Sequence, residues 1–299
     1  MPKLRLKWRF LSEEARIVTV MNKMRPEGKF IIANNLNLHY LEWGKPSVVP
    51  MILLHGLCGN AHYWDFFAHN MRSDYHILAP DQRGHGDSGW GESYGPKYYV
   101  RDLEAFVAQL GLDNIVLIGH SMGGINAIIY AARYPELVSR LAIVDIGPEI
   151  AAVGIERMER ELASEPEAFS SKEEAISYMG RIEPRQSDKF IRHQVRYALR
   201  QDESGDLRFK HDRALLSTEI RSPQWLWEYI TQVVCPSLVV HGMESDMLAR
   251  EVAERMGHSL AFGSVVDIEH AGHSVPGDNP NAFEAAVRRF LGIDGPQAM

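Results

Sequence analysis

Residues 114–124 read NIVLIGHSMGG, and this stretch decides the fold. The apolar run at 114–119 predicts a buried strand, and a helical pattern begins directly after Ser121. Gly119 and Gly123 flank the serine where a Cβ would crowd a sharp turn. A strand, a tight turn and a helix in this order are typical of a nucleophile elbow. The stretch therefore predicts that Ser121 is a nucleophile presented at the end of a strand.

The strand before Ser121 and the helix after it support this interpretation. A Gly-x-Ser-x-Gly pattern alone is a weak signal, because it can arise by chance. The simpler alternative is a Gly-rich turn that only packs a strand on a helix. The turn also aims the N-terminus of the following helix at Ser121, so the N–H of Met122 can face developing negative charge. Met122 is therefore predicted as one oxyanion donor.

A second oxyanion donor is expected after an earlier strand, in the stretch MILLHGLCGN at residues 51–60. Gly56 permits close approach of the backbone, and we expect the N–H of Leu57 to point at the same oxyanion. His55, at the strand end beside a glycine, is expected to fix the loop by hydrogen bonding. Cys58 would lie near this site, and we interpret it as a buried, inert thiol because no base for it is evident.

A serine hydroxyl needs a histidine base that a carboxylate orients. Asp246 lies in a loop directly after the apolar run at 237–242, where catalytic groups gather in open α/β sheets. Asp145 is the rival, since it ends the strand that follows the elbow helix, and Glu244 is a further alternative. We favour Asp246 as the acid, although such triads are defined by geometry and not by position.

The base candidates are His270 and His273, in the turn-rich loop before the last helix. Gly272 and Ser274 beside His273 allow its side chain to reach inward, whereas His270 continues directly from a strand. We therefore favour His273. The alternative is that both are ordinary surface-loop histidines.

Apolar, β-branched runs alternate with helical patterns in both directions from the elbow. We expect eight strands, at residues 29–34, 36–43, 49–55, 75–80, 114–119, 139–146, 237–242 and 264–269. Helices are expected near residues 60–72, 97–110, 122–134, 249–256 and 280–292. This alternation predicts a mostly parallel sheet covered by helices. The first two runs are separated only by Asn35 and predict an antiparallel hairpin at the sheet edge.

The alternation breaks for about ninety residues after Ile146, too long for a simple connection in a compact domain. We expect an α/β core at residues 29–148 and 233–299, with an inserted helical cap at 149–232 and an N-terminal extension at 1–28. Trp225, Trp227 and Tyr229 are expected to line the apolar inner side of the cap and to contact substrate. Plain packing is the alternative for these aromatic side chains.

Composition excludes several classes of protein. The 299 residues are 45% hydrophobic and 24% charged, with a net charge of −7, which leaves no dense basic surface for nucleic acid. No apolar run reaches the roughly 18 residues that span a bilayer, so no stable membrane insertion is expected. Two distant cysteines predict neither a disulfide framework nor a thiolate metal site. We expect a cytoplasmic protein. The alternating basic and apolar residues at 3–10 predict an edge strand or a poorly ordered leader, with a surface-binding arm as the alternative.

The chain from about 29 to 293 resembles the α/β-hydrolase superfamily. The resemblance rests on HGLCGN, DQRGHGDSG, GHSMGG, VDIGP, HGMESDML and HAGHSVPGDNP, all in the family's order. It implies an eight-stranded, mostly parallel α/β-hydrolase sheet with an inserted helical cap, and no metal or other cofactor. It also implies a triad of Ser121, Asp246 and His273, with Leu57 and Met122 as oxyanion donors. Asp81, Arg83 and Ser88 in DQRGHGDSG are expected to buttress the site.

The nucleophile narrows the reaction, because superfamily members that dehalogenate or open epoxides use aspartate where Ser121 stands. We expect a carboxylesterase-like serine hydrolase that cleaves a small carboxylic ester, thioester or lactone through an acyl-enzyme. One alternative is hydrolysis of a carbon–carbon bond in a vinylogous diketone acid, with Arg192, His193, Arg196 and Arg200 as candidate groups for the substrate carboxylate. Another is a non-catalytic ligand receptor on the same scaffold. Substrate identity and oligomeric state are not predicted.

Overall fold

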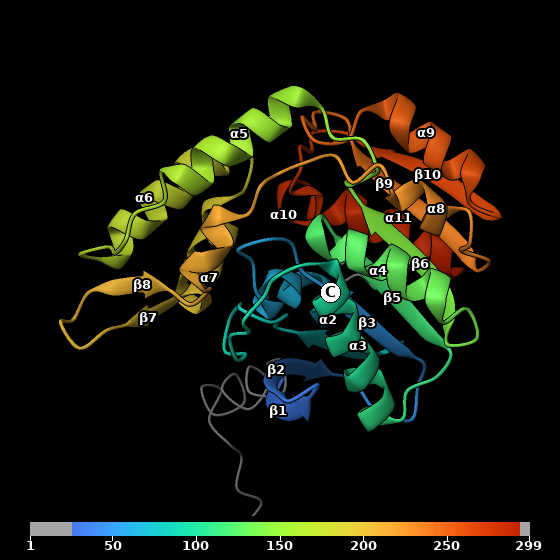
Figure 1. The fold of residues 1–299 in the computed structure, drawn as a ribbon, viewed down its shortest axis with the longest axis horizontal. Coiled ribbons are helices and arrows are strands. Elements are labelled where there is room, and N and C mark those ends of the chain that lie inside the picture. The colour runs from blue at the N-terminus through green and yellow to red at the C-terminus, as the bar shows by residue number, and fades with distance from the viewer. Residues whose placement is uncertain (1–25, 294–299) are drawn as a thin grey trace, which may run out of the picture.

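The computed structural model describes residues 26–293 (Figure 1). Residues 3–10, for which we predicted an edge strand or a poorly ordered leader, lie outside this range. So does most of the predicted extension at 1–28. The central sheet of the described chain has eight strands: β1 (Glu27–Ala33), β2 (Leu36–Trp43), β3 (Pro50–Leu54), β4 (His76–Pro80), β5 (Ile115–His120), β6 (Val138–Val144), β9 (Pro236–Gly242) and β10 (Phe262–Ile268).

The strand order across the sheet is β1-β2-β4-β3-β5-β6-β9-β10. The hairpin β1–β2 is antiparallel, and β2 also runs antiparallel to β4. The remaining pairs are parallel, which confirms the predicted mostly parallel sheet. Because β5 lies between β3 and β6, the carboxyl ends of these three strands meet at one edge of the sheet.

The central strands are apolar on both faces because helices cover both sides. In β3, Ile52 and Leu54 join one buried cluster, whereas Met51 and Leu53 join the other. One face packs on α3 (Pro96–Leu110), α4 (Met122–Arg133), α8 (Leu226–Ile230) and α9 (Arg250–Ser259). The opposite face packs on η1 (Ala61–Trp64), α2 (Asp65–Met71) and α11 (Pro280–Leu291), and the short α10 (Val275–Asp278) precedes α11.

An insertion at residues 149–222 leaves the sheet after β6. It contains α5 (Ala152–Ala163), α6 (Lys172–Ile182), α7 (Asp188–Ala198), the hairpin β7 (Leu199–Gln201) and β8 (Leu207–Phe209), and η2 (Arg213–Ser217). Figure 1 shows α5, α6, α7 and the hairpin together on one side of the sheet. Phe169, Tyr178, Ile191 and Val195 form a small core of their own within it.

The structure differs from the predicted cap at its C-terminal end. Helix α8 packs on α4, and Leu226, Ile230 and Val233 belong to a core cluster of the sheet. The segment predicted as the last part of the cap therefore covers the sheet instead. No helix within residues 26–293 is long and apolar enough to span a membrane.

Candidate active site

Ser121 lies at the turn between β5 and α4 with φ 53° and ψ −121°. This backbone conformation is strained for a residue with a side chain, and such strain gathers at functional sites. The glycines around it allow the turn. A Cβ on Gly119 would lie 2.2 Å from the carbonyl oxygen of Gly123, and one on Gly123 would lie 2.4 Å from that of Leu54. The predicted elbow is therefore present.

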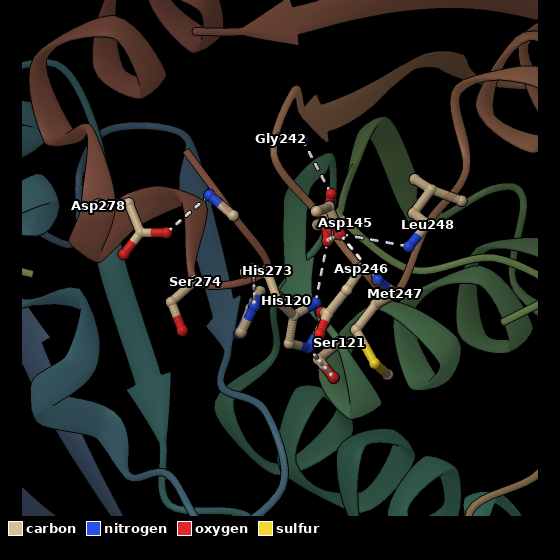
Figure 2. Close-up of polar contacts among 12 residues, drawn as sticks. His120, Ser121, Asp145, Gly242, Asp246, Met247, Leu248, His273, Ser274 and Asp278 are labelled. Carbon is tan, nitrogen blue, oxygen red and sulfur yellow. Dashed lines mark hydrogen bonds and ion pairs between the residues drawn. The ribbon is translucent and has the colours of Figure 1, made fainter. Parts of the chain in front are cut away.

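His273, in the loop after β10, reaches Ser121 from the far end of the chain. Its Nε2 lies 3.0 Å from Ser121 Oγ, and its Nδ1 lies 2.9 Å from Asp145 Oδ2 (Figure 2). The imidazole therefore bridges a hydroxyl and a carboxylate. His270, the other candidate, is mostly exposed and lies 3.8 Å from Glu244.

Asp145, and not Asp246, is the carboxylate at His273, so our predicted acid is corrected. Asp145 follows β6 directly and is fully buried, with a φ of 51°. Its Oδ1 accepts a hydrogen bond of 2.9 Å from the N–H of Gly242, and its Oδ2 accepts one from the hydroxyl of Ser245. These two donors hold the Asp145 carboxylate in place next to the imidazole of His273.

Asp246 lies nearby but is held by another partner. The guanidinium of Arg157 in α5 donates two hydrogen bonds, of 2.5 and 2.9 Å, to its two carboxylate oxygens. The loop after β9 therefore places Ser245 toward Asp145 and turns Asp246 toward the insertion.

The two predicted oxyanion donors flank Ser121. Met122 is the first residue of α4, and in the described chain its N–H has no hydrogen-bond acceptor. Leu57 lines the same cavity as Ser121, and its N–H is likewise unused within residues 26–293. Gly56 brings this loop close, since a Cβ there would lie 3.2 Å from Ser121 Cβ.

A cavity of about 180 Å³ opens over Ser121 and His273. The insertion supplies much of its wall. Its apolar side chains there are Met158, Leu162, Tyr178, Met179, Ile182, Ala198 and Phe209, and its polar ones are Arg157, Glu161, Glu165, Glu183, Gln186, Gln194 and His211. The wall is therefore mixed in character, with several acidic groups.

The four substrate-binding residues that we predicted in the cap lie elsewhere. Trp225 is 44% exposed, and Trp227 donates to Glu149 and packs under the Arg255 guanidinium. Tyr229 meets the guanidinium of Arg133, and Arg192 pairs with Asp188 on the surface. None of the four lines the cavity within the described chain, so that prediction is wrong. The aromatic residues follow α8, which packs on α4 rather than over Ser121.

The surrounding loops are held by buried polar contacts. His55 Nδ1 lies 2.8 Å from the Gly56 carbonyl oxygen, and the N–H of Gln82 donates to its Nε2. Asp81 accepts from the N–H groups of Ala61 and Asp87.

Arg83 and Ser88 have structural partners of the same kind. Arg83 makes a two-pronged ion pair with Asp102, and Ser88 donates to the carbonyl oxygen of Asp81. These contacts correspond to the buttressing role expected for DQRGHGDSG.

The electrostatics keep His273 neutral at pH 7. Burial lowers its pKa first, and the positive charge of Arg157 lowers it further, while Asp246 acts in the opposite direction. A neutral imidazole with Nδ1–H directed at Asp145 leaves Nε2 free to accept the Ser121 proton. Burial raises the pKa of Asp145, and hydrogen bonds from Ser245 and Gly242 oppose that rise.

Some residues that shape the site escaped the sequence analysis. His120 Nε2 donates to the backbone oxygen of His273, and burial, followed by the electrostatic interaction with the His273 side chain, lowers the pKa of His120 to about 3. Ser274 donates to Glu183, a cavity residue whose pKa burial raises to about 7. His120 is within the elbow motif itself, which could have marked it. Glu183 carries no comparable signal.

Three groups of side chains in the described chain could bind a metal ion: Cys58, Glu165 and His211; His62, Asp65 and His193; and His39, Asp81 and Asp87. In the last group Asp81 is already committed to two backbone N–H groups. Only the first group lies entirely on the wall of the cavity.

Known proteins resemble this chain over most of its length. A 3-hydroxybutyrate-oligomer hydrolase of Cupriavidus necator is 28% identical over 280 residues, which cover 85% of this chain and 92% of the relative. An esterase of Mycobacterium tuberculosis is 29% identical, over 84% of this chain and 85% of the relative. The crystal structure of E-2-(acetamidomethylene)succinate hydrolase superposes with a TM-score of 0.81 at 22% identity, over 89% of this chain and 99% of that one.

The family model described as alpha/beta hydrolase fold matches residues 49–280. This match spans β3 to the start of α11 and includes Ser121, Asp145 and His273. The strand order, the elbow at Ser121 and this match lead to one conclusion: the chain belongs to the alpha/beta hydrolase family.

Proposed function

We propose that this protein is a serine hydrolase that cleaves a small carboxylic ester, thioester or lactone through an acyl-enzyme on Ser121. One observation carries the proposal: His273 spans from Asp145, at 2.9 Å, to Ser121, at 3.0 Å. A buried carboxylate, a neutral imidazole and a hydroxyl on a strained turn form the arrangement that activates serine.

In the first half-reaction, His273 Nε2 takes the proton of Ser121 as Oγ attacks the substrate carbonyl carbon. The N–H groups of Leu57 and Met122 hold the resulting oxyanion. Asp145 stabilises the imidazolium. The bond from the carbonyl carbon to the leaving oxygen or sulfur then breaks, and His273 gives its proton to that leaving group.

In the second half-reaction, water attacks the acyl-enzyme and His273 accepts its proton. Collapse of this intermediate releases the carboxylic acid and returns the proton to Ser121 Oγ. No further reactant is needed, so both half-reactions use the same three side chains and the same two N–H groups.

The cavity supports a short acyl group. Its volume of about 180 Å³ is small, and acidic and amide side chains interrupt its apolar lining. Two curated relatives, named as an oligomer hydrolase and an esterase, fit hydrolysis of an acyl bond.

The two alternatives have less support. The carbon–carbon hydrolase needs a carboxylate clamp, but within the described chain the cavity lining includes none of the four predicted groups, Arg192, His193, Arg196 and Arg200. Arg157 does line the cavity, but it is paired with Asp246. A non-catalytic receptor has no need for the hydrogen-bonded order of Asp145, His273 and Ser121.

A substrate panel tests the proposal. Short-chain and long-chain esters, thioesters, lactones and a vinylogous diketone acid are compared with wild type and Ser121→Ala. We expect turnover of a short ester, thioester or lactone, reduced on the order of 10⁶-fold by the substitution. Turnover of the diketone acid alone would favour the alternative, and activity retained by Ser121→Ala would mean that the nucleophile lies elsewhere.

A further inference from the structure

Three potential metal ligands from distant parts of the chain meet on the cavity wall. Cys58 follows Leu57 in the loop after β3, Glu165 follows α5, and His211 follows β8. The two distant cysteines of the sequence predicted no thiolate metal site. In the structure, Glu165 and His211 from the insertion lie close to Cys58.

The geometry of the three side chains is compact. His211 Nε2 lies 3.0 Å from Glu165 Oε1, and one ligand atom from each of the three residues lies within 4.8 Å of the other two. His211 is 4% exposed, and the Glu165 side chain is 8% exposed. Cys58 is half-buried, so a sulfur, a nitrogen and an oxygen ligand lie close together on the cavity wall.

Further carboxyl groups lie near this cluster. Glu161 and Glu183 line the same cavity as Cys58, Glu165 and His211. Acidic side chains are therefore concentrated on this part of the cavity wall.

We propose that Cys58, Glu165 and His211 bind a divalent transition metal ion of the Zn²⁺ class. Thiolate and imidazole ligands favour such ions over Mg²⁺ and Ca²⁺, which prefer oxygen. Three protein ligands leave the fourth tetrahedral position to water. Binding releases the ligand protons, because the thiol and the imidazole must both be deprotonated.

The ion would regulate the site described above. The three ligands share one small cavity with Ser121 and His273, so a bound ion and its water take up space that an acyl substrate needs. Inhibition by zinc is the expected consequence, and this part alone rests on the proposed function.

Cobalt titration of the chelator-treated full-length protein tests binding without reference to activity. Co²⁺ bound to a thiolate absorbs in the near-ultraviolet, and a tetrahedral site adds visible bands. We expect one equivalent of Co²⁺ with both signals, displaced by Zn²⁺. No charge-transfer band in the folded protein would overturn the proposal.

Matched variants locate the ion. Cys58→Ser should abolish the charge-transfer band, and Glu165→Gln, which keeps the thiol, should weaken affinity at least about 100-fold. Cys235→Ser removes the other cysteine, which is buried beside Ser237, and should leave the band unchanged. His62→Ala removes a ligand of the rival cluster and should also leave it unchanged. A band that survives Cys58→Ser, or is lost in Cys235→Ser, contradicts the assignment.

An activity measurement completes the test. Zn²⁺ should inhibit the wild type reversibly, with recovery on chelation, and Cys235→Ser should be inhibited equally. If the protein shows no hydrolysis at all, the proposed function fails while the cobalt titration still decides the metal site. If cobalt binds at Cys58 but Zn²⁺ leaves hydrolysis unaffected, the regulatory part is overturned.

Discussion

Asp145 and Asp246 lie at the ends of neighbouring strands, and their partners separate their roles. The buried Asp145 has His273, Ser245 and the Gly242 N–H as partners, so its charge acts on the imidazole. Asp246 forms a two-pronged ion pair with Arg157, which ties the loop after β9 to α5.

The two aspartates are compared in the first prediction. Asp145→Asn should lower kcat on the order of 10⁴-fold, because the imidazole loses the charge that orients and stabilises it. Asp246→Asn should lower kcat far less than Asp145→Asn does. Steady-state kinetics with a short ester measures both, and the reverse ranking of the two variants would restore Asp246 as the acid.

The pH profile gives a second prediction. His273 acts as a base only when neutral, and burial and Arg157 lower its pKa to about 4. Activity should therefore persist below the ordinary histidine pKa of about 6.5 and be lost only as pH falls through about 4. Arg157→Gln removes a positive charge and frees Asp246, and both changes raise the pKa of His273. The acid limb of kcat/KM should therefore move to higher pH.

Arg192→Gln is the matched control for that profile, since Arg192 pairs with Asp188 on the surface. Its acid limb should coincide with that of the wild type. If the acid limb of kcat/KM in Arg157→Gln does not move, the Arg157 charge does not act on His273.

The sequence motifs predicted Ser121 and His273 as neighbours but not the acid on the other side of the imidazole. Asp145 and Asp246 both follow parallel strands that end at the same edge, and chain position does not reveal which way a side chain turns. The turn at Asp145, with φ 51°, and the competing partner Arg157 decide it. Both depend on tertiary contacts.

At the scale of elements, the elbow depends on the close approach of α4 to β3 and β5. Gly123 lies against the carbonyl oxygen of Leu54, so Gly123→Ala forces a backbone clash. We expect a loss of about 1–3 kcal/mol in the free energy of unfolding, measured by urea denaturation.

Gly180→Ala in α6 provides a control of opposite sign. The nearest atom to a Cβ added at Gly180 would be Ile191 Cδ1, at an ordinary van der Waals distance of 3.8 Å. Alanine favours a helix interior over glycine, so this variant should gain about 0.5–1 kcal/mol. If both variants lose stability equally, close packing at the elbow is not the cause.

The elements of the sheet were predictable because buried strands read as apolar runs and the helices between them as periodic patterns. The hairpin β1–β2 and the eight strands follow directly from these patterns. Helix α8 was misplaced because Trp225, Trp227 and Tyr229 indicate an apolar surface without identifying which surface they cover. Its packing on α4 is a long-range contact with no local signal.

At the scale of the whole molecule, the insertion and the sheet enclose the cavity together. Leu162 in α5 lines it, whereas Trp225 lies on the surface. Leu162→Trp should therefore lower kcat/KM more for longer acyl esters than for acetate esters, by filling space. Trp225→Ala should leave the chain-length profile unchanged. A changed profile would indicate that the segment around α8 contacts the substrate after all.

The substrate surface could not be predicted because it combines side chains from α5, α6, α7 and β8 that share no motif. Met158, Glu183 and Phe209 lie far apart in sequence and meet only once the insertion packs over Ser121. The motifs therefore predicted Ser121 and His273, whereas the wall of the cavity depends on how the insertion folds.

Labelling with a fluorophosphonate tests the central claim most directly, since the reagent reacts with an activated serine and needs no knowledge of the substrate. Intact-protein and peptide mass spectrometry should find one adduct, on Ser121, absent from Ser121→Ala and formed much more slowly in Asp145→Asn. A folded wild-type protein that remains unlabelled, or that is labelled at another residue, would contradict the activation of Ser121 by His273 and Asp145.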